Sequence, residues 1–109
     1  MSEFRLYLIQ RITALIMVPL VLGHLIVIVI AIQGGLTVGE ILSRTQGSIF
    51  WAVFYGLFVG AVSIHAAIGV RNIAQEWLGL GGKLLSGLSL AFAFALLWMG
   101  LSAVWAVTA

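Results

Sequence analysis

The chain has 109 residues, of which 63% are hydrophobic and 7% are charged, and its formal net charge is +2. A soluble domain of this length cannot bury so much apolar surface, so the composition excludes an ordinary water-soluble fold and indicates a membrane protein. The small net charge gives no reason to expect nucleic-acid binding. The absence of cysteine excludes disulfides, thiolate ligands and iron–sulfur ligation by this chain.

Three long apolar stretches predict an all-α integral membrane fold with three transmembrane helices. We expect one domain over residues 1–109, with helices at about residues 8–32, 49–72 and 84–107. Each stretch reaches the roughly 20 residues that a helix needs to cross the hydrocarbon core. The first stretch is too long for a secretory signal peptide, and no clean small-residue cleavage site follows it.

The basic residues predict how the helices are oriented in the membrane. If the chain crosses three times, four of the five basic residues fall on one side. The four are Arg5, Arg11, Arg71 and Lys83, and the fifth is Arg44. Because cytoplasmic loops are enriched in Lys and Arg, we expect the N-terminus and the second connection in the cytoplasm and the C-terminus outside.

The first helix begins with a pair of interfacial residues. Tyr7 and Arg11 lie four residues apart and therefore share a helix face. Aromatic and basic residues collect at membrane interfaces, so the pair would anchor the helix among lipid head groups. If the pair faces inward, it would instead help to bind the carboxylate or carbonyl of a ligand, and the spacing favours neither interpretation.

His24 is an ionisable residue in the interior of the first helix. Such a residue is costly inside a membrane and is a functional-site candidate for that reason. It shares a stripe at helical spacing with Thr13, Met17 and Leu20, and Pro19 is expected to kink the helix nearby. The imidazole is either a metal ligand or an anchor toward the outer interface.

His65 interrupts the second apolar stretch, within the segment SIHAAIGVRNIAQEW of residues 63–77. Ala61 and Gly69 lie one turn before and after it on the same face, and they leave room for a flat, bulky group. Neutral imidazole binds the iron of a haem well. Arg71 lies about 9 Å further along the helix axis, where it would meet a haem propionate. The alternative is a histidine that hydrogen-bonds a neighbouring helix.

The two histidines lie at different depths. His24 is expected about 21 Å below the cytoplasmic edge and His65 about 9 Å below it, a difference of about 12 Å. Two imidazoles on one iron are only about 4 Å apart. If both are ligands, there are therefore two haems stacked across the membrane, each with a second ligand from another chain. We accordingly expect this chain to be one half of a heteromeric helix bundle.

Two segments resemble the membrane-anchor (cytochrome b) subunits of succinate dehydrogenase and fumarate reductase, respiratory complex II. HAAIGVRNIAQEW is similar to the segment H-x3-G-x-R-[HN]-x3-[DE]-aromatic of these subunits, and QRITA resembles the segment H-R-x-[ST]-G that opens their first helix. Length and three-helix topology also match. The chain departs from the pattern at Gln10, where the family has histidine, at Ala14, where it has glycine, and at Tyr7, where a serine implicated in quinone binding often stands.

The resemblance implies one or two haems b, shared with a partner subunit, and a quinone as substrate. It makes His65 the axial ligand of the haem nearest the iron–sulfur subunit, and it makes His24 similar to the outer-haem ligand of two-haem members. Arg11 and Arg71 match arginines near the propionates and the quinone site, and Thr13 matches a small hydroxyl position. The candidate cofactor-binding residues are thus His65, His24, Arg11, Arg71, Gly69, Thr13 and Tyr7, with the two histidines as candidate metal ligands and no catalytic residue.

The resemblance also implies an assembly in the cytoplasmic (inner) membrane. Its other members would be a second small membrane anchor subunit, an iron–sulfur subunit and a flavoprotein that oxidises succinate. This chain would dock the soluble subunits and help to form the quinone site, and it carries no residues for succinate chemistry itself.

Other functions stay open at this point. The chain could be a haem-less structural anchor of the same complex, with both histidines bonded to partner helices. It could also be a b-type cytochrome anchor of another membrane dehydrogenase, although its short length favours a split anchor. A transporter or channel subunit would show polar residues converging from several helices, and the third stretch offers no charge.

Overall fold

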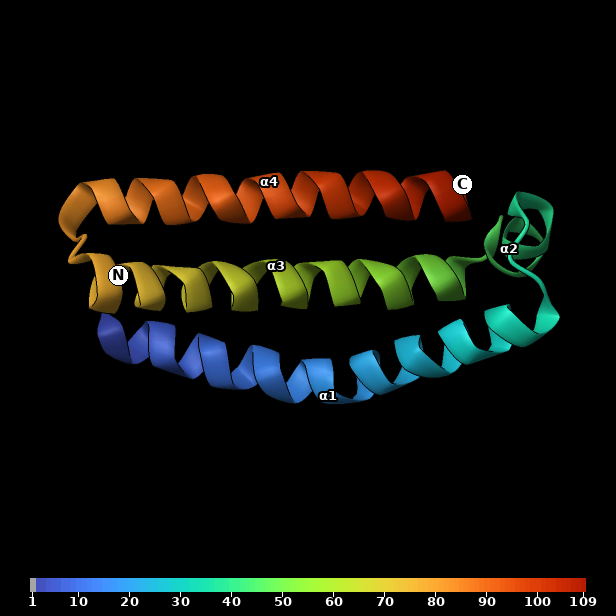
Figure 1. Ribbon diagram of the computed structural model, residues 1–109, viewed down its shortest axis with the longest axis horizontal. Coiled ribbons are helices and arrows are strands. Elements are labelled where there is room, and N and C mark those ends of the chain that lie inside the picture. Colours follow the sequence, from blue (N-terminus) through green and yellow to red (C-terminus); the bar gives the residue numbers. More distant parts are fainter. Residues whose placement is uncertain (1) are drawn as a thin grey trace.

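The computed structural model describes residues 2–109, which form four helices and no strand. The helices are α1 (Glu3–Gly34), α2 (Val38–Thr45), α3 (Ile49–Leu78) and α4 (Gly82–Thr108). The helices α1, α3 and α4 are long and apolar enough to cross a membrane. Figure 1 shows these three side by side with α3 in the middle, and α2 at one end of the bundle. The predicted all-α fold with three membrane-spanning helices is confirmed.

The helices extend beyond the apolar stretches that predicted them. α1 begins at Glu3 rather than near residue 8, because Ser2 caps it and accepts a hydrogen bond from the backbone N–H of Arg5. α3 continues to Leu78 rather than ending near residue 72, and it stops where Gly79 adopts a left-handed φ of 67°. Hydropathy marks the part of a helix that crosses the hydrocarbon, whereas capping residues mark its ends.

The short helix α2 was not predicted from the sequence. It lies in the polar connection between the first two apolar stretches, and it has only 8 residues. Thr37 caps its start by accepting a hydrogen bond from the backbone N–H of Glu40. A helix this short is not stable alone, so its contacts with the ends of α1 and α4 explain why it forms.

The α2 segment satisfies backbone carbonyls at the ends of two long helices. Arg44 donates from Nη2 to the carbonyl of Gly35, which caps α1, at 3.4 Å. Thr45 donates from Oγ1 to the carbonyl of Val107 at 2.6 Å, and the N–H of Gly47 donates to the carbonyl of Thr108 at 2.8 Å. The last carbonyls of a helix have no partner within it. Arg44, the one basic residue that the sequence assigned to this side of the molecule, therefore has a structural role.

Removing the Thr45 hydroxyl should loosen this connection. Thr45→Val keeps the side-chain shape but leaves the Val107 carbonyl without its donor, which we expect to destabilise the folded chain by about 1 kcal/mol. Thermal unfolding of the detergent-purified complex, followed by circular dichroism, measures the change. Ser43→Ala is the control, because the Ser43 hydroxyl bonds only within α2; equal midpoints for the two variants would contradict the prediction.

α1 and α4 pack against opposite sides of α3, and each meets it closely at a glycine. A Cβ on Gly23 of α1 would lie 3.0 Å from the ring of Phe54, and a Cβ on Gly100 of α4 would lie 2.5 Å from Cγ1 of Val59. Few side chains are buried, and the large apolar ones are mostly exposed. This surface suits a chain surrounded by lipid and by other membrane subunits.

The two ends of the bundle differ in charge as predicted. Figure 1 places the N-terminus and the α3–α4 connection at one end and the C-terminus and α2 at the other. The four basic residues that the sequence assigned to one side belong to the first end, and Arg44 belongs to the second.

Candidate functional site

Packing of α1 against α3 brings Thr13 and His65 together. Thr13 Oγ1 lies 3.3 Å from His65 Nδ1, and Thr13 is buried with 5% of its surface exposed. The same hydroxyl lies 2.8 Å from the carbonyl of Ile9 and 3.0 Å from that of Gln10, so its single proton goes back to the helix. It therefore accepts from His65 Nδ1–H. We assign the Nδ1–H tautomer on this basis, which leaves the lone pair of Nε2 for a ligand.

The space beside Gly69 on the α1 side is occupied by Gln10. A Cβ on Gly69 would lie 3.6 Å from Nε2 of Gln10, so glycine lets the amide come close to α3. Oε1 of Gln10 is buried and has no hydrogen-bond partner among residues 2–109. Gly69 was expected from the sequence to leave room beside His65, and in this chain the Gln10 side chain fills part of that room.

Arg71 lies at the same end of the bundle as the start of α1. Its Nη2 donates to Oε1 of Glu3 at 3.3 Å, and its Nη1 is buried without a partner in the described part of the chain. Arg71 follows His65 by six residues, which places it about 9 Å along α3 and about 120° around it. Arg71 is thus beside Glu3 rather than against the imidazole, and sequence reasoning did not identify Glu3.

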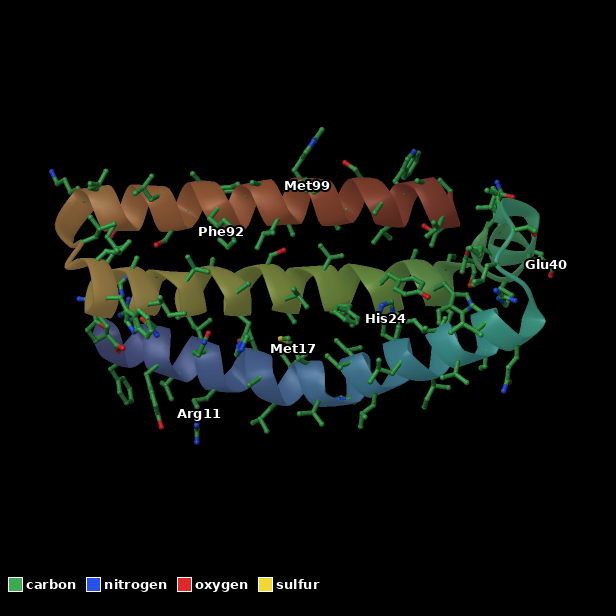
Figure 2. The ribbon with its side chains drawn as sticks, in the orientation of Figure 1. Arg11, Met17, His24, Glu40, Phe92 and Met99 are labelled. Atoms are coloured by element: carbon green, nitrogen blue, oxygen red, sulfur yellow. The ribbon has the colours of Figure 1, made fainter. Side chains whose placement is uncertain are left out.

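Tyr7 and Arg11 are not brought to this site. Figure 2 shows Arg11 pointing away from α3, whereas Met17 and His24 lie on the side of α1 that faces α3. Tyr7 is 57% exposed, and the Arg11 guanidinium carbon lies 5.6 Å from the centre of its ring. The pair faces the surroundings of the chain, where a lipid head group or another subunit would meet it.

His24 lies among aromatic side chains of α3, near the other end of the bundle. Its ring makes edge contacts with Phe58 and Tyr55, at centroid distances of 5.0 Å and 6.1 Å. Its Nδ1 is buried and has no partner among the residues that the structure describes. Beside it is a mainly apolar cavity of about 370 Å³, which Ile41 and Thr45 of α2 also line. Tyr55 and Phe58 were not predicted as site residues from the sequence, although their spacing from His65 places them at the predicted depth of His24.

The two histidines belong to separate sites. His24 is level with Tyr55 and Phe58, which precede His65 by ten and seven residues, so the sites lie about 10–15 Å apart along α3. This separation agrees with the depth difference expected from the sequence. Within residues 2–109, no three His, Cys, Asp or Glu side chains gather to hold a metal ion.

Comparison with known proteins identifies the family of this chain. Neither the curated proteins nor the solved structures give a match. The family profile of the succinate dehydrogenase/fumarate reductase transmembrane subunit matches residues 3–107, which is nearly the whole chain. The match covers α1, α2 and α3 and all but the last residue of α4, and it includes Thr13 and His65. The chain therefore belongs to the family of succinate dehydrogenase/fumarate reductase transmembrane subunits.

Proposed function

We propose that this chain is a haem-b-binding membrane anchor of a succinate:quinone oxidoreductase. The observation that carries the proposal is the hydrogen bond between Thr13 and His65. Histidines that bind a metal generally donate their other ring N–H to a fixed acceptor, which sets the tautomer and the ring orientation. Thr13 supplies that acceptor from a neighbouring helix.

The residues present fit an inner haem at His65. Nε2 of His65 would be the axial ligand from this chain, and the unpartnered Nη1 of Arg71 would bind a propionate near the membrane surface. A haem bound there would carry single electrons between the iron–sulfur subunit and the quinone. The other small anchor subunit would help to hold this haem, because no further histidine of this chain lies at that depth.

A second haem at His24 is part of the same proposal. The buried, unpartnered Nδ1 of His24 and the adjacent cavity support a ligand at this place. The separation from His65 means that such a haem would be distinct from the inner one. With haem at both sites, electrons could pass between the two sides of the membrane. Moving one elementary charge across a membrane potential of 100 mV changes its free energy by about 2.3 kcal/mol.

Tyr7 and Arg11 are proposed to contact quinone where this chain meets the soluble subunits. Both side chains are exposed at the end of the bundle that would face the cytoplasm, and neither is used in an ion pair within residues 2–109. In this arrangement the iron–sulfur subunit docks at the basic end, with the flavoprotein bound to it, and the C-terminus of this chain lies outside.

The haem content of the purified complex tests the proposal. A pyridine-haemochrome assay on the native complex, normalised to flavin, should give two haems b per flavin. His24→Ala should halve this ratio and leave the spectrum of the inner haem unchanged, because the two sites are separate. If the native complex holds one haem per flavin and His24→Ala does not lower this ratio, His24 is a packing residue and not a haem ligand. A complex without haem would show that the chain is a structural anchor.

A further inference from the structure

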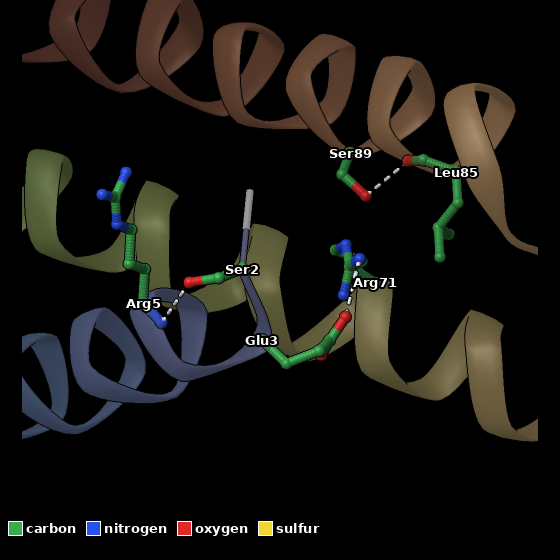
Figure 3. Close-up of polar contacts among 6 residues, drawn as sticks. All are labelled: Ser2, Glu3, Arg5, Arg71, Leu85 and Ser89. Carbon is green, nitrogen blue, oxygen red and sulfur yellow. Dashed lines mark hydrogen bonds and ion pairs between the residues drawn. The ribbon is translucent and has the colours of Figure 1, made fainter.

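Glu3 and Arg71 form the only ion pair within residues 2–109. The two side chains differ greatly in exposure, with 13% of the Arg71 side chain exposed and 70% of the Glu3 side chain. Figure 3 shows the pair joining the first turn of α1 to the last part of α3. The pair therefore connects an exposed carboxylate to a nearly buried guanidinium.

Stability of this chain alone does not account for the pair. An ion pair with one exposed partner adds little, because water screens the attraction and both side chains lose freedom. Nη1 of Arg71 is moreover buried with no hydrogen-bond partner in residues 2–109, and an unpaired buried donor is destabilising. Within residues 2–109 the arrangement is thus incomplete, and it is completed when an acceptor from outside these residues reaches Nη1.

α1 orients two side chains of α3 in the same way. Thr13 of α1 holds His65, and Glu3 of α1 holds Arg71. The start of α1 is ordered by the Ser2 cap, and a carboxylate in the first turn is favoured by the helix dipole. Glu3 therefore holds one nitrogen of the guanidinium, Nη2. Because the guanidinium is planar, holding Nη2 limits the directions in which Nη1 can point.

We infer that Glu3 is a positioning residue, which holds Arg71 by Nη2 so that Nη1 binds a carboxylate supplied by another component of the complex. The planar guanidinium is suited to carboxylates, because its nitrogens donate charge-assisted hydrogen bonds in fixed directions. Two components have a carboxylate to offer, a haem propionate and an acidic side chain of a docked soluble subunit. The inference rests on the proposed function. It adds to that function Glu3, which lies outside the segments QRITA and HAAIGVRNIAQEW that resemble the family.

A double-mutant cycle on the assembled complex tests the inference. The variants are Glu3→Gln, Arg71→Gln and the two combined. The first measurement is the rate of haem transfer to apomyoglobin, and the second is the release of the soluble subunits from membranes in a chaotrope wash. We expect Glu3→Gln to speed one of these about fivefold, and to have no further effect when Arg71 is already replaced.

The two measurements identify the source of the carboxylate. If Glu3→Gln speeds haem loss, the carboxylate bound by Arg71 is a haem propionate. If it speeds release of the soluble subunits, the carboxylate is an acidic side chain of a partner. Glu40→Gln is the matched control, because it removes the same charge from the opposite end of the bundle and should change neither rate. No effect of Glu3→Gln, or an equal effect with and without Arg71, would overturn the inference. If the complex holds no haem, the haem proposal fails, but the subunit-release measurement still tests Glu3.

Discussion

His65→Ala is expected to abolish the inner haem signal while the complex still assembles. The substitution removes the only imidazole that this chain offers at that depth, and it introduces no bulk or charge into the contact between α1 and α3. The reduced-minus-oxidised spectrum and the haem-to-flavin ratio measure the loss. Retained haem with an unchanged spectrum would show that His65 is not a ligand.

Variants of Thr13 separate the loss of the ligand from the loss of its orientation. Thr13→Val keeps the shape of the side chain but removes the acceptor for His65 Nδ1–H, and loss of such an outer partner typically costs 10–100-fold in metal affinity. We expect a weakening of about this size in a haem titration. Thr13→Ser retains the hydroxyl and should bind nearly as well as the native chain. Equal affinity in both variants would contradict the assigned tautomer.

Gly100→Ala is expected to disrupt the contact between α3 and α4. The added Cβ would lie 2.5 Å from Cγ1 and 2.9 Å from Cγ2 of Val59, and valine has little rotamer freedom with which to yield. Overpacking of this kind costs about 1–3 kcal/mol. The thermal unfolding midpoint of the purified complex should fall. Both residues line the cavity beside His24, so the spectrum of the outer haem that we propose there should change as well.

Gly87→Ala on the same helix is the control for this prediction. Nothing lies within 4 Å of a Cβ built on Gly87, so the methyl group meets open space in this chain. Its unfolding midpoint should stay close to that of the native complex. If Gly100→Ala is as well tolerated as Gly87→Ala, the close approach at Val59 does not hold α4 in place.

The pairs of residues in the site show how far sequence reasoning reached. Helical spacing correctly put Thr13 and His24 on one stripe of α1, and the positions of His24 and His65 within their apolar stretches put the two histidines at different depths. The hydrogen bond between Thr13 and His65 joins residues 52 positions apart, and no local pattern encodes it. For Arg11 the spacing allowed an inward and an outward orientation, and only the packing of α1 on α3 turned it outward.

The composition and hydropathy of this sequence alone determined that it forms three membrane-crossing helices, with most of its basic residues at one end. Lipid imposes that result, because each crossing helix must satisfy its own backbone and expose apolar side chains, whatever its neighbours are. Only the tertiary structure decided that α2 forms, that Glu3 reaches Arg71 and that Gln10 lies beside Gly69. These features depend on contacts between helix ends and faces far apart in the chain, so they exist only once α1 and α4 have packed against α3.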